Sequence, residues 1–189
     1  MKKIPDNAKK VFEGIIFDVY HWEQEMFDGT FSTFEAVKRK NSVTVVAVTE
    51  EGKIIVNHEE QPSKTPFISF PGGMVEASED TLVAAKRELL EESGFVSEDW
   101  NEWFVSDPLD YKKLEWNVYF YIAKNCKKLS EQHLDNGEKI ITQLLSFDEF
   151  LELRKDTRSR NKDIAPYLEK AASSEEEKQK LKDLLGIKT

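Results

Sequence analysis

The chain has 189 residues, of which 39% are apolar and 11% aromatic, enough for one hydrophobic core of ordinary domain size and too apolar for a disordered chain. Its formal net charge of −9 argues against binding to a nucleic-acid backbone, and no apolar run is long enough to span a membrane. The single cysteine, Cys126, cannot form an internal disulfide, and the first residues lack the apolar stretch of a signal peptide. We therefore expect a cytoplasmic protein in which Cys126 is a small buried residue.

The first forty residues predict β-structure. Residues 11–22 are rich in β-branched and aromatic side chains and predict one strand, and residues 30–37 predict a second. Between them, Phe27-Asp28-Gly29-Thr30 is a turn signal, because Asp-Gly supplies the positive φ angles of a tight hairpin. We expect residues 1–40 to form an N-terminal β-hairpin extension and residues 41–189 to form the main domain.

The main domain alternates between predicted strands and helices. Residues 43–48 form an apolar strand that should be central, and Glu51-Gly52 turns the chain into a hairpin with residues 53–56. Further short strands are expected at residues 67–70, 104–105, 116–123 and 140–145. Capping-box spacing from Ser146 and again from Ser174 predicts two C-terminal helices, the second ending at Gly186. Such a mixture indicates a layered α/β fold.

A helix is predicted from about residue 80 to residue 93. Ser78 is the expected N-cap, and Glu79 and Asp80 would then lie in the first turn, near the positive end of the helix dipole. Gly94 occupies the position of the glycine that commonly ends a helix.

Three glutamates share one face of this helix. At 100° of rotation per residue, Glu88, Glu91 and Glu92 lie within an arc of about 100°. Glu88 and Glu92 form a like-charge pair that destabilises an isolated helix by about 0.2–0.5 kcal/mol. Arg87 is placed to pair with Glu91, and a hard cation such as Mg²⁺ would relieve the remaining repulsion. Glutamate-rich helix faces are more often solvated surface, so these residues alone do not establish a metal site.

The spacing around the glutamates distinguishes this segment. The order is glycine, five residues, glutamate, seven residues, Arg-Glu, an aliphatic residue, one residue, Glu-Glu, one residue, glycine and an apolar residue. This pattern resembles the Nudix box at its nine defining positions, which are Gly73, Glu79, Arg87, Glu88, Leu89, Glu91, Glu92, Gly94 and Phe95. The resemblance implies a Nudix fold of the α/β (α+β) class, an α/β/α sandwich around a mixed β-sheet.

The resemblance also implies an enzyme, a hydrolase that acts on a phosphorus-containing acid anhydride. Its substrate would be a nucleoside diphosphate linked to another moiety, and its cofactor would be Mg²⁺, with Mn²⁺ as a substitute. Glu88, Glu91 and Glu92 would be the metal ligands. The carbonyl oxygen of Gly72 or Gly73 would complete the coordination shell.

The other motif residues are assigned roles by the same resemblance. Arg87 would orient a glutamate, and either Glu88 or Glu91 would alternatively orient the attacking water. Glu79 and Gly94 would be structural.

Several features resemble the ADP-ribose pyrophosphatase branch of that family. These are the β-hairpin extension, Pro108 fourteen residues after Gly94, and the acidic loop at residues 135–138, where Glu138 would assist the metal or the water. In that branch the N-terminal hairpin exchanges between subunits, which implies a homodimer with two-fold symmetry. ADP-ribose or a similar nucleotide sugar is therefore the favoured substrate.

Other substrates and protein classes remain as alternatives. Ile68-Ser69 replaces the usual Trp-Glu of that branch, and Gln61 replaces its usual arginine, which leaves nucleoside triphosphates and dinucleotides open. A non-catalytic nucleotide-binding module usually has a damaged box, whereas this box is complete. An RNA-decapping enzyme would be expected to carry a basic cluster, and the charge of −9 argues against it.

Overall fold

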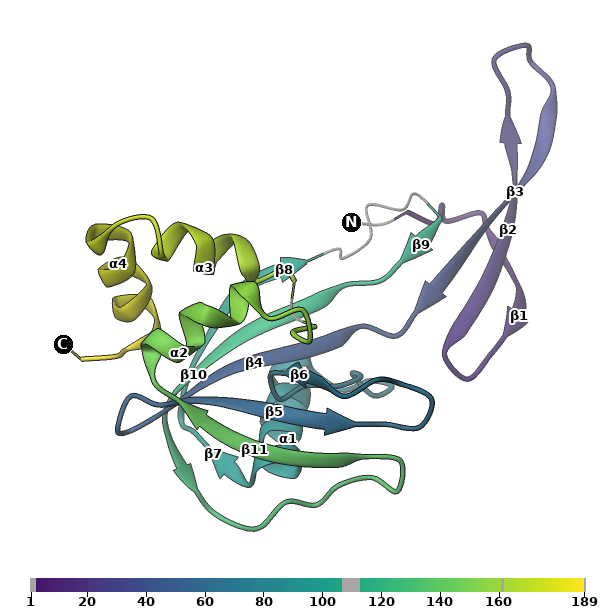
Figure 1. Ribbon diagram of the computed structural model, residues 1–189. Coiled ribbons are helices and arrows are strands. Elements are labelled where there is room, and N and C mark those ends of the chain that lie inside the picture. The colour runs from purple at the N-terminus through teal and green to yellow at the C-terminus, as the bar shows by residue number, and fades with distance from the viewer. Residues whose placement is uncertain (1–2, 107–112, 161, 189) are drawn as a thin grey trace.

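The computed structural model describes residues 3–106, 113–160 and 162–188. Within them, a seven-stranded mixed sheet forms the body of the molecule and a four-stranded sheet extends from it (Figure 1). The main sheet follows the order β11 (Lys139–Leu145), β5 (Ile54–Glu60), β4 (Ser42–Thr49), β10 (Val118–Lys128) and β7 (Phe95–Val96). β6 (Phe67–Ser69) pairs with β5, and β8 (Asp99–Ser106) pairs with β10. β4 and β10 run parallel, and their neighbours in this sheet are antiparallel.

Helices cover both faces of the main sheet. α1 (Thr81–Ser93) packs through Ala84, Ala85 and Leu89 against one face of β4. α2 (Phe147–Glu152), the 3₁₀ turn η1 (Leu153–Lys155), α3 (Ala165–Ala171) and α4 (Glu175–Leu185) cover the opposite face (Figure 1). β4 is buried along its whole length because alternate side chains enter the two cores. The expected α/β/α sandwich around a mixed sheet is therefore confirmed.

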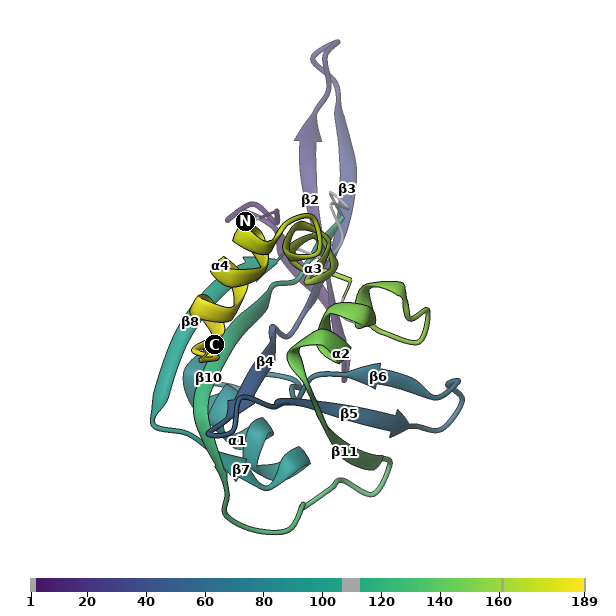
Figure 2. The same ribbon diagram turned by 60° about the vertical axis from the view of Figure 1, so that its left-hand side comes forward.

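The smaller sheet projects away from the body in both views (Figures 1 and 2). It consists of β1 (Lys9–Glu13), β2 (Phe17–Glu25), β3 (Phe31–Arg39) and β9 (Leu114–Glu115). Gly29, at φ 80°, makes the expected turn between β2 and β3. The single strand predicted over residues 11–22 was wrong, because the chain reverses after Gly14 and forms the separate strands β1 and β2. A Cβ at Gly14 would lie 2.5 Å from the Phe17 carbonyl oxygen, so this reversal requires glycine.

Local predictions failed where the chain makes longer-range contacts. α1 begins at Thr81, and Asp80 rather than Ser78 is its N-cap, with the Asp80 side chain accepting from the Leu82 N–H. Ser78 instead adopts φ 65° in the preceding loop, so Glu79 and Asp80 precede the helix. β8 and β10 are longer than predicted, because each is extended by pairing with the other. The capping box from Ser146, by contrast, is confirmed.

Cys126 is buried, as predicted. Pro108 lies outside the described residues. No helix among the described residues is long and apolar enough to cross a membrane.

Gly94 ends α1 in the left-handed conformation, at φ 71°, and a Cβ there would lie 2.1 Å from the Ser130 carbonyl oxygen. We expect Gly94→Ala to lower the unfolding free energy by about 2 kcal/mol or more, because the left-handed conformation alone costs an alanine about 1–2 kcal/mol. The melting temperature should fall by roughly 4–8 °C. Gly137→Ala is the matched control, because its Cβ would meet nothing within 4 Å. Equal melting temperatures for the two variants would contradict this role for Gly94.

Candidate functional site

The loop between β6 and α1 lies against the first half of β4. The Val45 N–H donates to the Pro71 carbonyl at 2.8 Å, and the Val43 N–H donates to the Gly73 carbonyl at 2.9 Å. A Cβ at Gly72 would lie 2.2 Å from the Val43 carbonyl oxygen, so only glycine allows this approach. The hydrogen bond from the Val43 N–H occupies one lone pair of the Gly73 carbonyl oxygen.

The loop also lies directly over the glutamates of α1. A Cβ at Gly73 would lie 2.4 Å from Glu88 Oε1, and the Gly72 N–H donates to Glu92 Oε2 at 3.0 Å. The fold therefore brings both predicted glycines to two of the predicted metal ligands. Any larger residue at position 73 would have to displace the Glu88 carboxylate.

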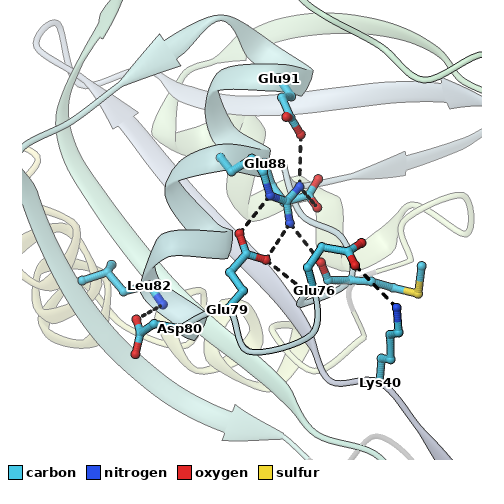
Figure 3. Close-up of polar contacts among 9 residues, drawn as sticks. Lys40, Glu76, Glu79, Asp80, Leu82, Glu88 and Glu91 are labelled. Atoms are coloured by element: carbon cyan, nitrogen blue, oxygen red, sulfur yellow. Dashed lines mark hydrogen bonds and ion pairs between the residues drawn. The ribbon is translucent and has the colours of Figure 1, made fainter.

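Arg87 joins the loop to the helix through five hydrogen bonds. Its Nε and Nη2 each donate to the Glu79 carboxylate at 3.0 Å, and Nη1 donates to Glu88 at 2.8 Å and to Glu91 at 3.1 Å. Nη2 also donates to the Met74 carbonyl at 3.1 Å. Figure 3 labels Glu79, Glu88 and Glu91 and draws these contacts as dashed lines. The hydrogen bonds to Glu79 above all raise the pKa of Arg87, which stays charged and fixes the directions of three carboxylates.

Glu92 faces away from Arg87 and into the protein. Its side chain is only 5% exposed, and its Oε2 accepts from Asn57 Nδ2 at 3.0 Å as well as from the Gly72 N–H. Burial, followed by repulsion from Glu59, raises its pKa to about 9. At neutral pH a neighbouring cation would offset the cost of ionising this carboxyl.

Burial also raises the pKa of Glu88, to about 7, against the opposing effect of Arg87. Glu138 lies in the turn before β11, where burial and repulsion from Glu59 raise its pKa too. Glu138 in turn contributes to the raised pKa of both Glu88 and Glu92, so the predicted late acidic residue belongs to the same electrostatic site.

Sequence reasoning missed two residues of this site, Asn57 and Glu59 on β5. Asn57 is completely buried and donates to Glu92, and its own Oδ1 accepts from Thr142 Oγ1 at 3.2 Å. Glu59 is 6% exposed and accepts from Ser69 Oγ, and burial raises its pKa. A signal was present, because Asn57 and Glu59 follow the buried Ile55 at every second position and so share its α1-facing side of the strand.

The donor set suits a hard divalent cation. Its candidate ligands are carboxylate and carbonyl oxygens, and three of the carboxylates, Glu88, Glu92 and Glu138, have raised pKa values that a cation would lower again. No three His, Cys, Asp or Glu side chains among the described residues already form a closed metal-binding cluster. The reason is that Arg87 holds Glu88 and Glu91, whereas Glu92 is turned toward Asn57. Metal binding would therefore require the Glu88 and Glu91 side chains to turn toward Glu92.

A cleft of about 370 Å³ opens beside the loop, within the usual size range of small-molecule sites. Gly72, Gly73 and Glu59 line it, and the two glycines contact Glu92 and Glu88. Arg39, Trp116 and Arg160 line other parts of its wall. The cleft is therefore continuous with the carboxylate site and large enough to hold part of a nucleotide.

Comparison with known proteins agrees with this geometry. The NUDIX domain family matches residues 38–168, more than half of the chain. An ADP-ribose pyrophosphatase from Bacillus subtilis (strain 168) is 30% identical over 149 residues, covering 77% of this chain and 79% of the relative. A methanol dehydrogenase activator from Bacillus methanolicus is 31% identical over 153 residues, covering 80% of this chain and 82% of the relative.

A solved structure of an ADP compounds hydrolase has the same fold, with a TM-score of 0.71. It is 18% identical and covers 97% of this chain and 95% of that one, so it is similar in architecture rather than in sequence. The family and enzyme class expected from the box are confirmed. The chain belongs to the Nudix hydrolase family.

Proposed function

We propose that this protein is a Mg²⁺-dependent pyrophosphohydrolase that cleaves the diphosphate of ADP-ribose or a similar nucleotide sugar. The observation that carries the proposal is the buried carboxylate of Glu92, crowded by Glu59 and Glu88 beside an open cleft. Such an arrangement is costly unless a cation joins it. The ADP-ribose pyrophosphatase relative, at 30% identity, supports the choice of substrate.

Glu88, Glu91 and Glu92 would hold the cation, together with the carbonyl oxygen of Gly72 or Gly73. When bound, Mg²⁺ or Mn²⁺ would neutralise the diphosphate and lower the pKa of a bound water. The Gly72 N–H and Asn57 fix one oxygen of Glu92, which leaves its other oxygen available. Of the two carbonyl oxygens, that of Gly72 is the better candidate, because the Gly73 carbonyl already accepts from the Val43 N–H.

Three residues are candidates for orienting the attacking water. Glu88 and Glu91 lie on α1 and are hydrogen-bonded to Arg87, which would select their rotamers. Glu138 lies on a separate turn, where burial and repulsion from Glu59 raise its pKa, and a raised pKa makes a carboxylate a stronger base. Glu79 would act on the reaction only through Arg87.

The N-terminal extension supports a homodimer. Large apolar side chains are exposed along it, including Ile15 at 92%, Phe31 at 63% and Phe12 at 60%. Exposed apolar surface on this scale usually marks an interface. We propose that a second copy of the chain covers this sheet. We also propose that the protein is cytoplasmic.

The substrate assignment predicts a specific product pattern. Purified protein with Mg²⁺ should hydrolyse ADP-ribose to AMP and ribose 5-phosphate, identified by mass, with a higher kcat/KM than for diadenosine polyphosphates or deoxynucleoside triphosphates. Chelation of the metal should abolish the reaction. Preference for a triphosphate would contradict the nucleotide-sugar assignment, and the absence of hydrolysis across the panel would contradict the enzyme.

Glu92→Gln should separate catalysis from stability. The variant keeps an oxygen that can accept from Asn57 and Gly72 but loses a charged metal ligand. We expect kcat to fall by about 100-fold or more, equivalent to about 2.7 kcal/mol in the activation barrier. Glu76→Gln, in the loop between β6 and α1 and paired with Lys40, is the control and should retain wild-type activity.

Without metal at pH 8, Glu92→Gln should be more stable than wild type. Because the folded-state pKa of Glu92 is raised to about 9, its contribution to stability is full below about pH 4.5 and is lost as the pH rises toward 9. Metal-free wild type should therefore lose more stability than Glu92→Gln between pH 5 and pH 9, measured by denaturant unfolding with a chelator present. Parallel pH profiles for the two proteins would show that Glu92 is not buried as described.

The dimer proposal is tested by light scattering coupled to size exclusion. Wild type should elute at twice the mass of the chain, and Ile15→Asp combined with Phe31→Asp should elute as a monomer, because each change places a charge in the proposed apolar interface. Ile141→Asp, at a 63% exposed residue on β11 outside the extension, is the control and should remain dimeric. A monomeric wild type at high protein concentration would refute the dimer.

A further inference from the structure

The segment between β10 and β11 caps the C-terminal end of α1, the end that carries Glu91 and Glu92. Carbonyl groups in the last turn of a helix have no partner within the helix, so other groups must satisfy them. Here the His133 N–H donates to the Glu91 carbonyl at 2.8 Å, and the Gln132 side chain donates to the Glu92 carbonyl. Adjacent residues of one segment therefore hold the backbone of two proposed metal ligands.

The Gln132 side chain also reaches β11. Its Nε2 donates to Thr142 Oγ1 at 3.0 Å as well as to the Glu92 carbonyl. The Thr142 hydroxyl in turn lies 3.2 Å from Asn57 Oδ1 and 3.3 Å from the Glu92 carbonyl oxygen. A hydroxyl has a single proton to donate, and the Glu92 carbonyl already accepts from Gln132. The Thr142 proton is therefore best used by Asn57, which is completely buried.

Asn57 connects this series of hydrogen bonds to the Glu92 carboxylate. An ionised carboxylate only accepts, so the amide must present its N–H group to it, and Nδ2 donates to Glu92 Oε2 at 3.0 Å. The amide oxygen then lies on the side of Thr142, where the hydroxyl supplies the donor that a buried oxygen requires. Gln132 and Thr142 thus hold Glu92 at two points, its backbone carbonyl and, through Asn57, its side chain.

Capping of α1 accounts for only one of the two bonds from Gln132. The bond to Thr142 leads away from the helix end and toward the buried amide of Asn57. Without the Thr142 hydroxyl, Asn57 Oδ1 would lose its donor, and a buried oxygen left unsatisfied costs about 1–3 kcal/mol. Asn57 would then be held less firmly against Glu92.

Resting on the proposed function, we propose that Gln132 and Thr142 are positioning residues that hold Glu92 for the cation through Asn57. Asn57 and the Gly72 N–H fix Oε2 of Glu92, and the other oxygen is left for the cation. Replacing a residue that orients a metal ligand in this way typically changes metal affinity about 10- to 100-fold.

The main test measures Mn²⁺ binding to the full-length protein by electron paramagnetic resonance, without substrate. Thr142→Val removes the hydroxyl and keeps the shape of the side chain, whereas Thr142→Ser keeps the hydroxyl. Thr49→Val is the matched control, because Thr49 is 4% exposed on β4 and its hydroxyl accepts from the Lys53 N–H at 3.2 Å.

Thr142→Val should weaken Mn²⁺ binding by about 10-fold or more, and Thr142→Ser should restore most of the affinity. Thr49→Val should lower the melting temperature without changing the affinity for Mn²⁺. Gln132→Met removes the donors at the other end of the pair and should also weaken binding. The double variant of Gln132→Met and Thr142→Val should lose little more than the larger single loss, because both changes act through Asn57.

A second measurement follows Asn57 itself and needs no metal. Its side-chain amide signal, assigned by its loss in Asn57→Asp, should exchange slowly with solvent in wild type because the residue is completely buried. In Thr142→Val the exchange should be about 10-fold faster or more, as expected for a lost buried hydrogen bond. Thr142→Ser should exchange at nearly the wild-type rate.

Equal Mn²⁺ affinity in wild type, Thr142→Val and Gln132→Met would overturn this role, as would an equal loss in Thr142→Ser or Thr49→Val. Unchanged exchange at Asn57 in Thr142→Val would also overturn it. If wild type binds Mn²⁺ and hydrolyses ADP-ribose while the variants match it, only this inference fails. If wild type binds no Mn²⁺ and hydrolyses no diphosphate substrate, the proposed function itself fails.

Discussion

Burial of the Glu92 carboxylate is the constraint on which the rest of the site depends. Glu92 is held between α1, β5 and the glycine loop by Asn57 and by the Gly72 N–H. That position requires glycine at residue 72, since any side chain there would collide with β4. It also places a carboxylate among others where water screens poorly, which is unfavourable for a protein without a bound cation. This unfavourable burial of a carboxylate is the main structural argument for a cation at the site.

Arg87 and the proposed cation would each interact with a different group of the site's carboxylates. Arg87 forms ion pairs with Glu79, Glu88 and Glu91 and sets their directions, so its single positive charge offsets only part of theirs. The acidic groups that remain, Glu92, Glu59 and Glu138, lie toward β5 and β11. A protein with a net charge of −9 thereby concentrates negative potential beside a cleft, and the proposed cation would offset that potential when an anionic substrate binds.

The parts of the site that sequence reasoning found are local, and the parts it missed depend on strand pairing. The box spacing identified Arg87, Glu88, Glu91 and Glu92 because they lie within two turns of one helix. Asn57 enters the site only because β5 lies beside β4. Arg39 lines the cleft only because β3 leads directly into β4. Ser78 was assigned as a cap from its residue type, but the loop needs a left-handed residue there, and Asp80 caps the helix instead.

The central claim is that Glu88, Glu91 and Glu92 bind a divalent cation together. Anomalous diffraction from crystals grown with Mn²⁺ and a diphosphate ligand measures this most directly. The account predicts an anomalous peak within about 2.0–2.2 Å of oxygens from these glutamates and next to the Gly72–Gly73 loop, with the diphosphate bound to the same metal. Well-ordered diphosphate in the cleft, with no peak near the glutamates and with Glu88 and Glu91 still bound to Arg87, would contradict it.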